Sequence, residues 1–265
     1  MEKLVIIPTY NEKENIGQII GAVIGLQQDY HILVIDDNSP DGTADIVKSF
    51  SGTYPGQLFL EERTGKQGLG TAYIHGFKWA LAKGYQFIFE MDADFSHNPC
   101  DLEKLYLTCK HGADMAVGSR YVRGGAIENW PRNRIALSKG ASLYTRMITW
   151  MPVKDPTAGF VCYTRLVLES INLDAISFIG YAFQIEMKFA AWKLGFEIRE
   201  VPITFIDRKL GASKMNKGIV KEGILGVLQL RWNSLFKNYH KKVQNNISDN
   251  PSPSFSQTEA LLESK

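Results

Sequence analysis

The stretch LVIIPTYNEKENIGQIIGAVIGLQQDYHILVID, residues 4–36, decides the fold class. Two short and nearly continuous apolar runs, 4–8 and 32–36, flank an amphipathic segment at 15–26 that is long enough for a helix. Strands that are covered on both faces are continuously apolar, and parallel neighbours need a long crossover, usually a helix, between them. The stretch therefore predicts a strand–helix–strand unit with a right-handed crossover.

The same alternation continues through the first half of the chain. Further strands are expected at 58–60, 87–91 and 115–118, and further helices at 42–50, 69–83 and 102–110. Repeating units of this kind build a doubly wound, mostly parallel α/β sheet, in which ligands bind beyond the carboxyl ends of the strands. We predict one Rossmann-like domain over residues 1–240, because sheet folds of this length often form a single domain.

The second half of the chain has a different pattern. Residues 120–134 are rich in Gly, Arg and aromatic residues and predict a loop, while Phe183, Met187, Ala190 and Leu194 have the spacing of a core-facing helix. The other expected elements are a helix at 135–150, strands at 159–163 and 198–205, a polar loop at 207–217 and a helix at 219–239. Residues 241–265 have the composition of a disordered tail.

Composition excludes several classes of protein. A net charge of +2 lacks the basic field of a nucleic-acid-binding domain. Cys100, Cys109 and Cys162 have no metal-ligand spacing, and their odd count is typical of reduced thiols in a cytoplasmic protein. The chain shows neither a cleavable signal nor about 18 consecutive apolar residues, so we expect any membrane contact to be peripheral.

A pair of carboxylates directly follows one of the expected strands. Asp92 and Asp94 come after the apolar run 87–91, and alternate residues of an extended segment point the same way. An oxygen-only pair suits Mg²⁺ or Mn²⁺, with nucleotide phosphates completing the shell. Ser96 is either a third ligand, directly or through water, or a hydroxyl that stabilises a turn.

Polar residues also follow the first two strands. The segment 36–42 contains Asp36, Asp37 and several turn-forming residues, and its second carboxylate could accept hydrogen bonds from a nucleotide base. Pro8 closes the first strand, and Tyr10 could stack on the same base. The glycines of 65–70 match neither the P-loop nor the G-x-G-x-x-G spacing and are a weak phosphate signal.

Two loops carry a cluster of cations. Arg120, Arg123, Arg132 and Arg134 lie in one, and Arg208, Lys209 and Lys214 in the other. A solvated surface is one interpretation. The other is phosphate binding, because both loops begin where a strand ends and the guanidinium fork fits phosphate oxygens.

Seven segments in this order resemble the dolichol (polyprenol) phosphate mannose synthases, inverting glycosyltransferases of family 2 with a GT-A fold. The resemblance covers about residues 3–230, and its segments are 5–12, 35–43, 68–76, 91–97, 118–121, 183–186 and 207–214. It implies transfer of a hexose, such as mannose from GDP-mannose, to a polyprenyl monophosphate with the help of Mg²⁺ or Mn²⁺.

The resemblance also implies roles for individual residues. The donor site would comprise Pro8, Tyr10, Glu12, Ile35, Asp37, Asp92, Ala93, Asp94 and Lys214. The acceptor phosphate would be bound by Arg120, Arg134, Ser138 and Arg208. Catalysis would rest on Asp94, Arg120 and Arg208, and the metal on Asp92, Asp94 and Ser96.

Two alternatives remain open from the sequence. One is a transferase of the same fold that uses UDP-glucose, UDP-GlcNAc or a hydroxyl acceptor, for which Glu186 could be the base, although a satisfied carboxylate on the covering helix is its simpler interpretation. The other concerns residues 218–240, which are either a terminal helix packed on the domain or an amphipathic helix at the cytoplasmic membrane surface.

Overall fold

The computed structural model describes residues 2–26, 28–180, 182–208, 217–237 and 239–240. A seven-stranded sheet with the order β3-β2-β1-β4-β7-β5-β8 forms its centre. The strands are β1 Lys3–Thr9, β2 Tyr30–Asp36, β3 Leu58–Glu62, β4 Phe87–Glu90, β5 Met115–Ser119, β7 Val161–Thr164 and β8 Ile198–Pro202. All neighbours are parallel except β7, which is antiparallel to both β4 and β5. The predicted doubly wound, mostly parallel sheet is confirmed.

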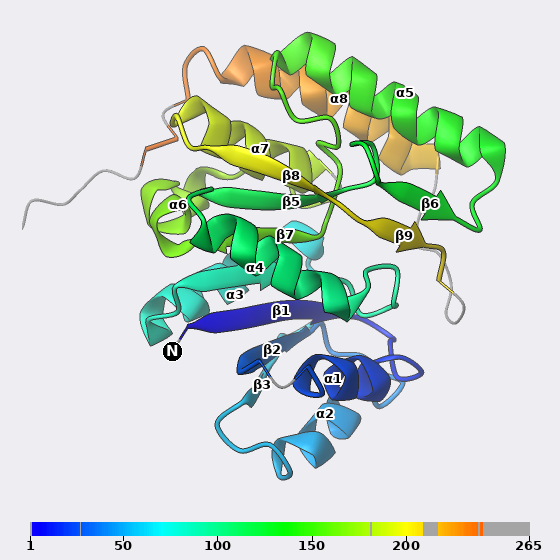
Figure 1. Cartoon of the computed structure of the whole chain (residues 1–265), viewed down its shortest axis with the longest axis vertical. Coiled ribbons are helices and arrows are strands. Elements are labelled where there is room, and N and C mark those ends of the chain that lie inside the picture. Colours follow the sequence, from blue (N-terminus) through cyan, green and yellow to red (C-terminus); the bar gives the residue numbers. More distant parts are fainter. Residues whose placement is uncertain (1, 27, 181, 209–216, 238, 241–265) are drawn as a thin grey trace, which may run out of the picture.

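Helices cover both faces of the sheet, and two more lie outside them (Figure 1). The first layer contains α1 Ile16–Ile24, α2 Thr43–Ser51 and α4 Leu102–Lys110. The second contains α3 Leu69–Lys83, α6 Arg165–Ser170 and α7 Ala182–Lys193. The outer pair, α5 Arg132–Thr149 and α8 Lys217–Asn233, pack against each other, and α8 also contacts α7. None of the described helices is both long and apolar enough to cross a membrane.

The strand periodicity divides the core into two clusters. Leu4 and Ile6 of β1 belong to the cluster under α3, whereas Val5 and Ile7 belong to the cluster under α1. The helix α3 comes unusually close to β1, because a Cβ at Gly76 would lie 2.9 Å from carbon atoms of Ile6. A larger residue at this position would have to displace the packed side chains of Ile6 and Ile35.

Two predicted segments differ from the structure. The single strand predicted at 198–205 is wrong, because it is divided into β8 and β9 Thr204–Ile206. Ile203 lies between them and bonds to Ser119, after which β9 leaves the main sheet and pairs with β6 Ala126–Glu128. The predicted loop at 120–134 is likewise wrong in part, since it contains β6 and the first turn of α5. Both departures come from pairing between distant segments, which local periodicity does not encode.

Candidate active site

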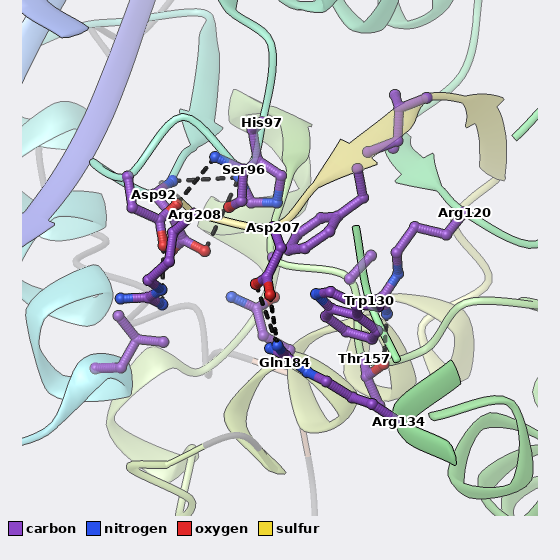
Figure 2. A pocket seen from close by; sticks show the side chains of 17 residues that line it. Asp92, Ser96, His97, Arg120, Trp130, Arg134, Thr157, Gln184, Asp207 and Arg208 are labelled. Atoms are coloured by element: carbon purple, nitrogen blue, oxygen red, sulfur yellow. Dashed lines mark hydrogen bonds and ion pairs between the residues drawn. The ribbon is translucent and has the colours of Figure 1, made fainter. Parts of the chain in front are cut away.

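A central cavity opens at the carboxyl end of β4, where the main sheet meets the small β6–β9 sheet (Figure 2). Charged side chains of both signs line it: Asp92, Asp94, Asp207, Arg120, Arg134 and Arg208. The strand-end carboxylates and the two basic loops therefore meet in one place, as the carboxyl-end rule predicts for a sheet of this type.

Asp94 is held firmly beside Arg208. Its Oδ2 lies 2.8 Å from the Arg208 Nη2, and its Oδ1 accepts the backbone N–H of Ser96 at 3.0 Å. Burial raises the pKa of Asp94, but hydrogen bonding from Ser96 and the charge of Arg208 outweigh it and leave the pKa below its ordinary value. Asp94 is therefore ionised at neutral pH.

Asp92 is in a different electrostatic environment from Asp94. Its side chain keeps 39% of its surface accessible, so a small cation in the cavity can reach it. The surrounding protein nevertheless raises its pKa to about 7, first through burial and then through the negative charge of Asp94, with Glu90 and Glu12 adding to the effect. Negative charge thus exceeds its compensation at this point, which favours a bound cation.

Ser96 completes the set of oxygen atoms. The residue is 2% exposed, and its buried hydroxyl lies beside the Asp94 carboxylate, whose pKa it helps to lower. Among the described residues no three His, Cys, Asp or Glu side chains come together as metal ligands. Two carboxylates and a neighbouring hydroxyl fit Mg²⁺ or Mn²⁺, which leave positions for water and phosphate oxygens.

His97 forms one wall of the cavity and is neutral. Its Nδ1 accepts the Asp92 N–H at 3.3 Å, and its ring stacks on Phe160 with the centroids 4.9 Å apart. Burial lowers the pKa of His97 to about 4 against the attraction of Asp94. The imidazole therefore supports the backbone of Asp92 and carries no charge at neutral pH.

The opposite wall is basic and organised around Trp130 (Figure 2). The Arg134 guanidinium carbon lies 3.9 Å from the centre of the Trp130 ring, and Arg134 Nη1 bonds Asp207 at 3.1 Å. The Arg120 guanidinium lies 5.8 Å from the centre of the same ring. One indole therefore orients two of the three cavity arginines.

Arg120 has a structural partner that the sequence did not reveal. Its Nε and Nη2 bond the two oxygens of Asp155 at 2.7 and 2.6 Å, and Nη2 also reaches Thr157 at 2.9 Å. Asp155 is fully buried, and the pKa of Arg120 is raised by this pairing despite its burial. The predicted contact of Arg120 with an acceptor phosphate stays a prediction, and the structure adds a role in holding the loop.

Ser138 lies on α5 outside the lining of the central cavity. Its Oγ accepts a hydrogen bond from the Tyr121 hydroxyl at 2.7 Å. Its predicted acceptor role also stays a prediction, as does that of Lys214, which lies outside the described residues.

The predicted nucleotide residues lie at the carboxyl ends of β1 and β2 or shortly after them. Pro8 and Ile35 are partners in the β1–β2 ladder, and the Ile35 side chain is fully buried, so only its main chain can face a ligand. Tyr10 lies under the Lys66 ammonium, 4.8 Å from it. The Glu12 backbone N–H donates to Thr43 at 3.0 Å. The donor assignments of these residues stay predictions.

Arg63 was missed by the sequence analysis. Its Nε donates to Asp37 Oδ1 at 2.6 Å, and its Nη1 reaches Thr71 at 2.8 Å. Arg63 directly follows β3, so the carboxyl-end rule applied to the third strand could have found it. The glycines of 65–70, a weak phosphate signal in the sequence, follow Arg63 along the chain. Gly70 is explained by packing, because a Cβ at this position would meet Phe178 and Phe183 within 3 Å.

Glu186 lies outside the lining of the cavity, on α7. Its Oε2 accepts the N–H groups of Ser177 and Phe178 at 2.8 and 3.0 Å, and its Oε1 accepts the Lys237 ammonium at 2.6 Å. The interpretation of Glu186 as a satisfied structural carboxylate is therefore confirmed, and the alternative of a catalytic base loses its residue.

Comparison with known proteins agrees with this geometry. The model of glycosyl transferase family 2 matches residues 4–171. Polyprenol monophosphomannose synthase of Mycolicibacterium smegmatis is 46% identical over 226 residues, which cover 85% of each chain. Undecaprenyl-phosphate mannosyltransferase of Micrococcus luteus is 45% identical over 239 residues, or 89% of this chain and 98% of that one.

A solved structure extends the likeness of the fold. Glucosyl-3-phosphoglycerate synthase of Mycobacterium tuberculosis, determined with Mn²⁺ and UDP, superimposes with a TM-score of 0.65 at 17% identity, covering 87% of this chain and 80% of that one. The chain belongs to glycosyltransferase family 2 and is a glycosyltransferase with a GT-A fold. Within that family it is similar to enzymes named for mannosyl transfer to polyprenyl phosphates.

Proposed function

We propose that this protein transfers mannose from GDP-mannose to a polyprenyl monophosphate, with inversion at the sugar carbon. The names of relatives at 45% and 46% identity support the sugar and the acceptor. The observation that carries the proposal is the central cavity, where Asp92 and Asp94 lie opposite Arg134 and close to Arg208.

The chemistry of the acceptor matches this distribution of charge. A phosphate monoester has a second pKa near 6, so at neutral pH it is already largely dianionic. Its oxygen attacks the sugar carbon, the bond from that carbon to the nucleoside diphosphate breaks, and no proton has to be removed. Arg134 and Arg208 orient the attacking phosphate, and this positioning replaces a general base.

The carboxylates act on the donor side of the same cavity. Asp92, Asp94 and Ser96 would hold Mg²⁺ or Mn²⁺, which would supply positive charge to the departing nucleoside diphosphate. Arg208 pairs with Asp94 and so links the donor side to the basic wall. Tyr10, Asp37 and Lys214 are assigned to the donor, and Arg63 holds the Asp37 carboxylate in place.

A hydroxyl acceptor is the second candidate. Such an acceptor needs a general base at the attacking oxygen. Glu186 is bonded elsewhere, Asp94 is paired with Arg208, Asp207 is paired with Arg134, and Asp92 is assigned to the metal. These pairings favour an acceptor that arrives already ionised.

We further propose that the enzyme works on the cytoplasmic surface of a membrane. Large apolar side chains are exposed on α5 and on α8 with the segment that follows it: Leu137, Leu143, Met147, Trp150, Leu225, Leu228, Trp232, Leu235 and Phe236. The two helices lie side by side (Figure 1), and Arg231 stacks on Trp150 at 4.6 Å. Such a surface suits the headgroup layer, where the polyprenyl tail stays while its phosphate enters the site.

A donor and acceptor screen tests this function. The full chain is incubated with polyprenyl phosphate and GDP-mannose, UDP-glucose or UDP-GlcNAc, with Mg²⁺ or Mn²⁺, and the products are analysed by mass. We expect a hexosyl-polyprenyl phosphate from GDP-mannose alone. Transfer to polyprenol or to a sugar hydroxyl, with none to the phosphate, would show that the second candidate is correct.

A further inference from the structure

A second basic hollow lies along α5, separate from the residues that carry the proposed chemistry. We define the α5 pocket by Lys139, Ser142, Arg146 and Lys154. Arg120 and Tyr121 also line it, and Arg120 borders the central cavity as well. The pocket is therefore a neighbour of the acceptor side of the site, but three cations that face it have no role there.

Two polar groups of the α5 pocket have no hydrogen-bond partner among the described residues. Ser142 is 3% exposed, and its hydroxyl makes no hydrogen bond to any described residue. The buried Nε of Arg146 also has no hydrogen-bond partner among the residues that the structure describes. Two acidic side chains near the pocket residues have partners, because Glu200 accepts the N–H groups of Lys154 and Asp155, and Asp155 pairs with Arg120. Buried donors that stay unpaired are costly, so a ligand that accepts hydrogen bonds would relieve that cost.

The sequence of α5 places this pocket beside an apolar surface. Residues 139, 142 and 146 follow helical spacing on one stripe, Leu143 and Met147 follow it on the adjacent stripe, and Trp150 comes directly after the helix. Those three apolar side chains are 54%, 59% and 71% exposed. A ligand that fits both stripes has an anionic oxygen-rich head and an apolar tail.

We propose that the α5 pocket binds the phosphate of an anionic membrane phospholipid while Leu143 and Met147 contact its acyl chains. The pocket is distinct from the acceptor phosphate site and sets the orientation of the catalytic cavity toward the bilayer. The inference rests on the membrane association proposed above, but it does not depend on the identity of the sugar or acceptor.

Vesicle binding by the full chain tests the proposal without any polyprenyl phosphate present. Vesicles of phosphatidylcholine are compared with vesicles that contain phosphatidylglycerol as well, and binding is measured by flotation. Each cation at a membrane surface contributes about 1 kcal/mol, or about 5-fold in affinity. We expect Lys139→Ala with Arg146→Ala to weaken binding to the phosphatidylglycerol vesicles by about 30-fold and to leave binding to pure phosphatidylcholine unchanged.

Two further variants separate a pocket from general attraction of charge. Lys104→Ala with Lys110→Ala removes the same charge from α4, which covers the other face of the sheet, and should change binding to phosphatidylglycerol vesicles far less. Ser142→Ala should lower the preference for phosphatidylglycerol while leaving the melting temperature unchanged, because the hydroxyl it removes has no partner.

Three results would overturn the proposal. The first is that the double α5 variant keeps its preference for phosphatidylglycerol, or that it loses no more affinity for these vesicles than the α4 variant. The second is that inorganic phosphate at constant ionic strength releases the protein from the vesicles, which would assign the pocket to a soluble anion. The third is that the double α5 variant has a higher KM for polyprenyl phosphate in detergent, which would make the pocket part of the acceptor site. If the protein did not transfer mannose, the vesicle result would still be valid, because that assay contains no polyprenyl phosphate.

Discussion

Asp92 and Asp94 are two residues apart and have opposite electrostatic environments. Arg208 and Ser96 keep the pKa of Asp94 low, while burial and neighbouring carboxylates raise the pKa of Asp92 to about 7. The alternation of side chains along an extended segment explains why both face the cavity. The difference between them comes mainly from Ser96, which hydrogen-bonds Asp94 alone, together with the direct ion pair between Asp94 and Arg208.

Replacing either carboxylate should abolish transfer. Asp92→Ala and Asp94→Ala each remove a proposed metal ligand that stabilises several kcal/mol of charge, so we expect a loss of roughly 100-fold or more in kcat. Asp174→Ala, a substitution of an exposed carboxylate, is the control. Activity of the double variant within a few-fold of the parent enzyme, both measured with Mg²⁺ or Mn²⁺, would mean that the metal role is wrong.

Arg134 and Arg208 should act mainly on the acceptor. A charge-assisted hydrogen bond contributes about 1.5–3 kcal/mol, so Arg134→Ala and Arg208→Ala should each lower kcat/KM for polyprenyl phosphate by about 10- to 100-fold. Arg123→Ala, on the same loop, is the matched control. Steady-state kinetics with each substrate varied in turn distinguish this from a donor effect, which would contradict the assignment.

Arg120 should be needed for the stability of the fold as well as for activity. Arg120→Ala leaves the fully buried Asp155 without its partner, and breaking such a pair costs about 3–5 kcal/mol. Urea denaturation of the variant and of Arg123→Ala measures the difference. An unchanged free energy of unfolding for Arg120→Ala would mean that Asp155 finds other partners.

At the scale of elements, α8 has a buried inner side and an exposed outer side. Val227 and Leu230 are buried in the core cluster, whereas Leu228 and Trp232 are 48% and 68% exposed. Lys237, just beyond the helix, pairs with the buried Glu186. The two interpretations of this segment, a packed terminal helix and a membrane-facing one, are therefore compatible in one helix.

Substitutions on the two sides of α8 test its packing and its proposed membrane contact separately. Leu230→Ala should lower the free energy of unfolding by about 2–5 kcal/mol and leave vesicle binding per folded molecule unchanged. Leu228→Ser with Trp232→Ser should weaken flotation on neutral and anionic vesicles by roughly 10-fold or more and leave stability unchanged. Equal flotation of the outer-side variant and the parent protein would exclude α8 from the membrane contact.

At the scale of the whole molecule, the carboxyl end of the sheet collects residues from segments far apart in the chain. The cavity combines the end of β4, the loop before α5 and the segment after β9. His97 lies where these segments meet, and it stacks on Phe160 and packs edge-on against Phe205. Its neutral form is thus tied to the closed packing of the domain.

Acid should destabilise the protein through His97. The pKa of His97 is about 4 in the folded protein and 6.5 when unfolded, so the unfolded state binds more protons between these values. Stability should therefore fall as the pH drops from 6.5 to 4, by up to about 3 kcal/mol from this residue. Urea denaturation across that range, compared with His97→Gln to subtract the carboxylates, measures the contribution; parallel curves would contradict it.

Much of the fold and the position of the candidate site were predictable from local pattern. Apolar runs with helical segments between them predicted the mostly parallel sheet, and the strand-end rule placed Asp92 and Asp94 near the basic loops. Both inferences depend only on side-chain periodicity and on the direction of parallel strands. For the same reason the order of the first five strands along the chain agrees with the structure.

Pairing between distant segments was decided only by the tertiary structure. The antiparallel insertion of β7 between β4 and β5 and the division of 198–205 into two strands depend on which backbones come side by side. The same holds for the partners of Arg120 and Arg134, which are Asp155 and Asp207. An ion pair needs two atoms within a few ångströms, and no spacing along the chain encodes that distance until the chain has folded.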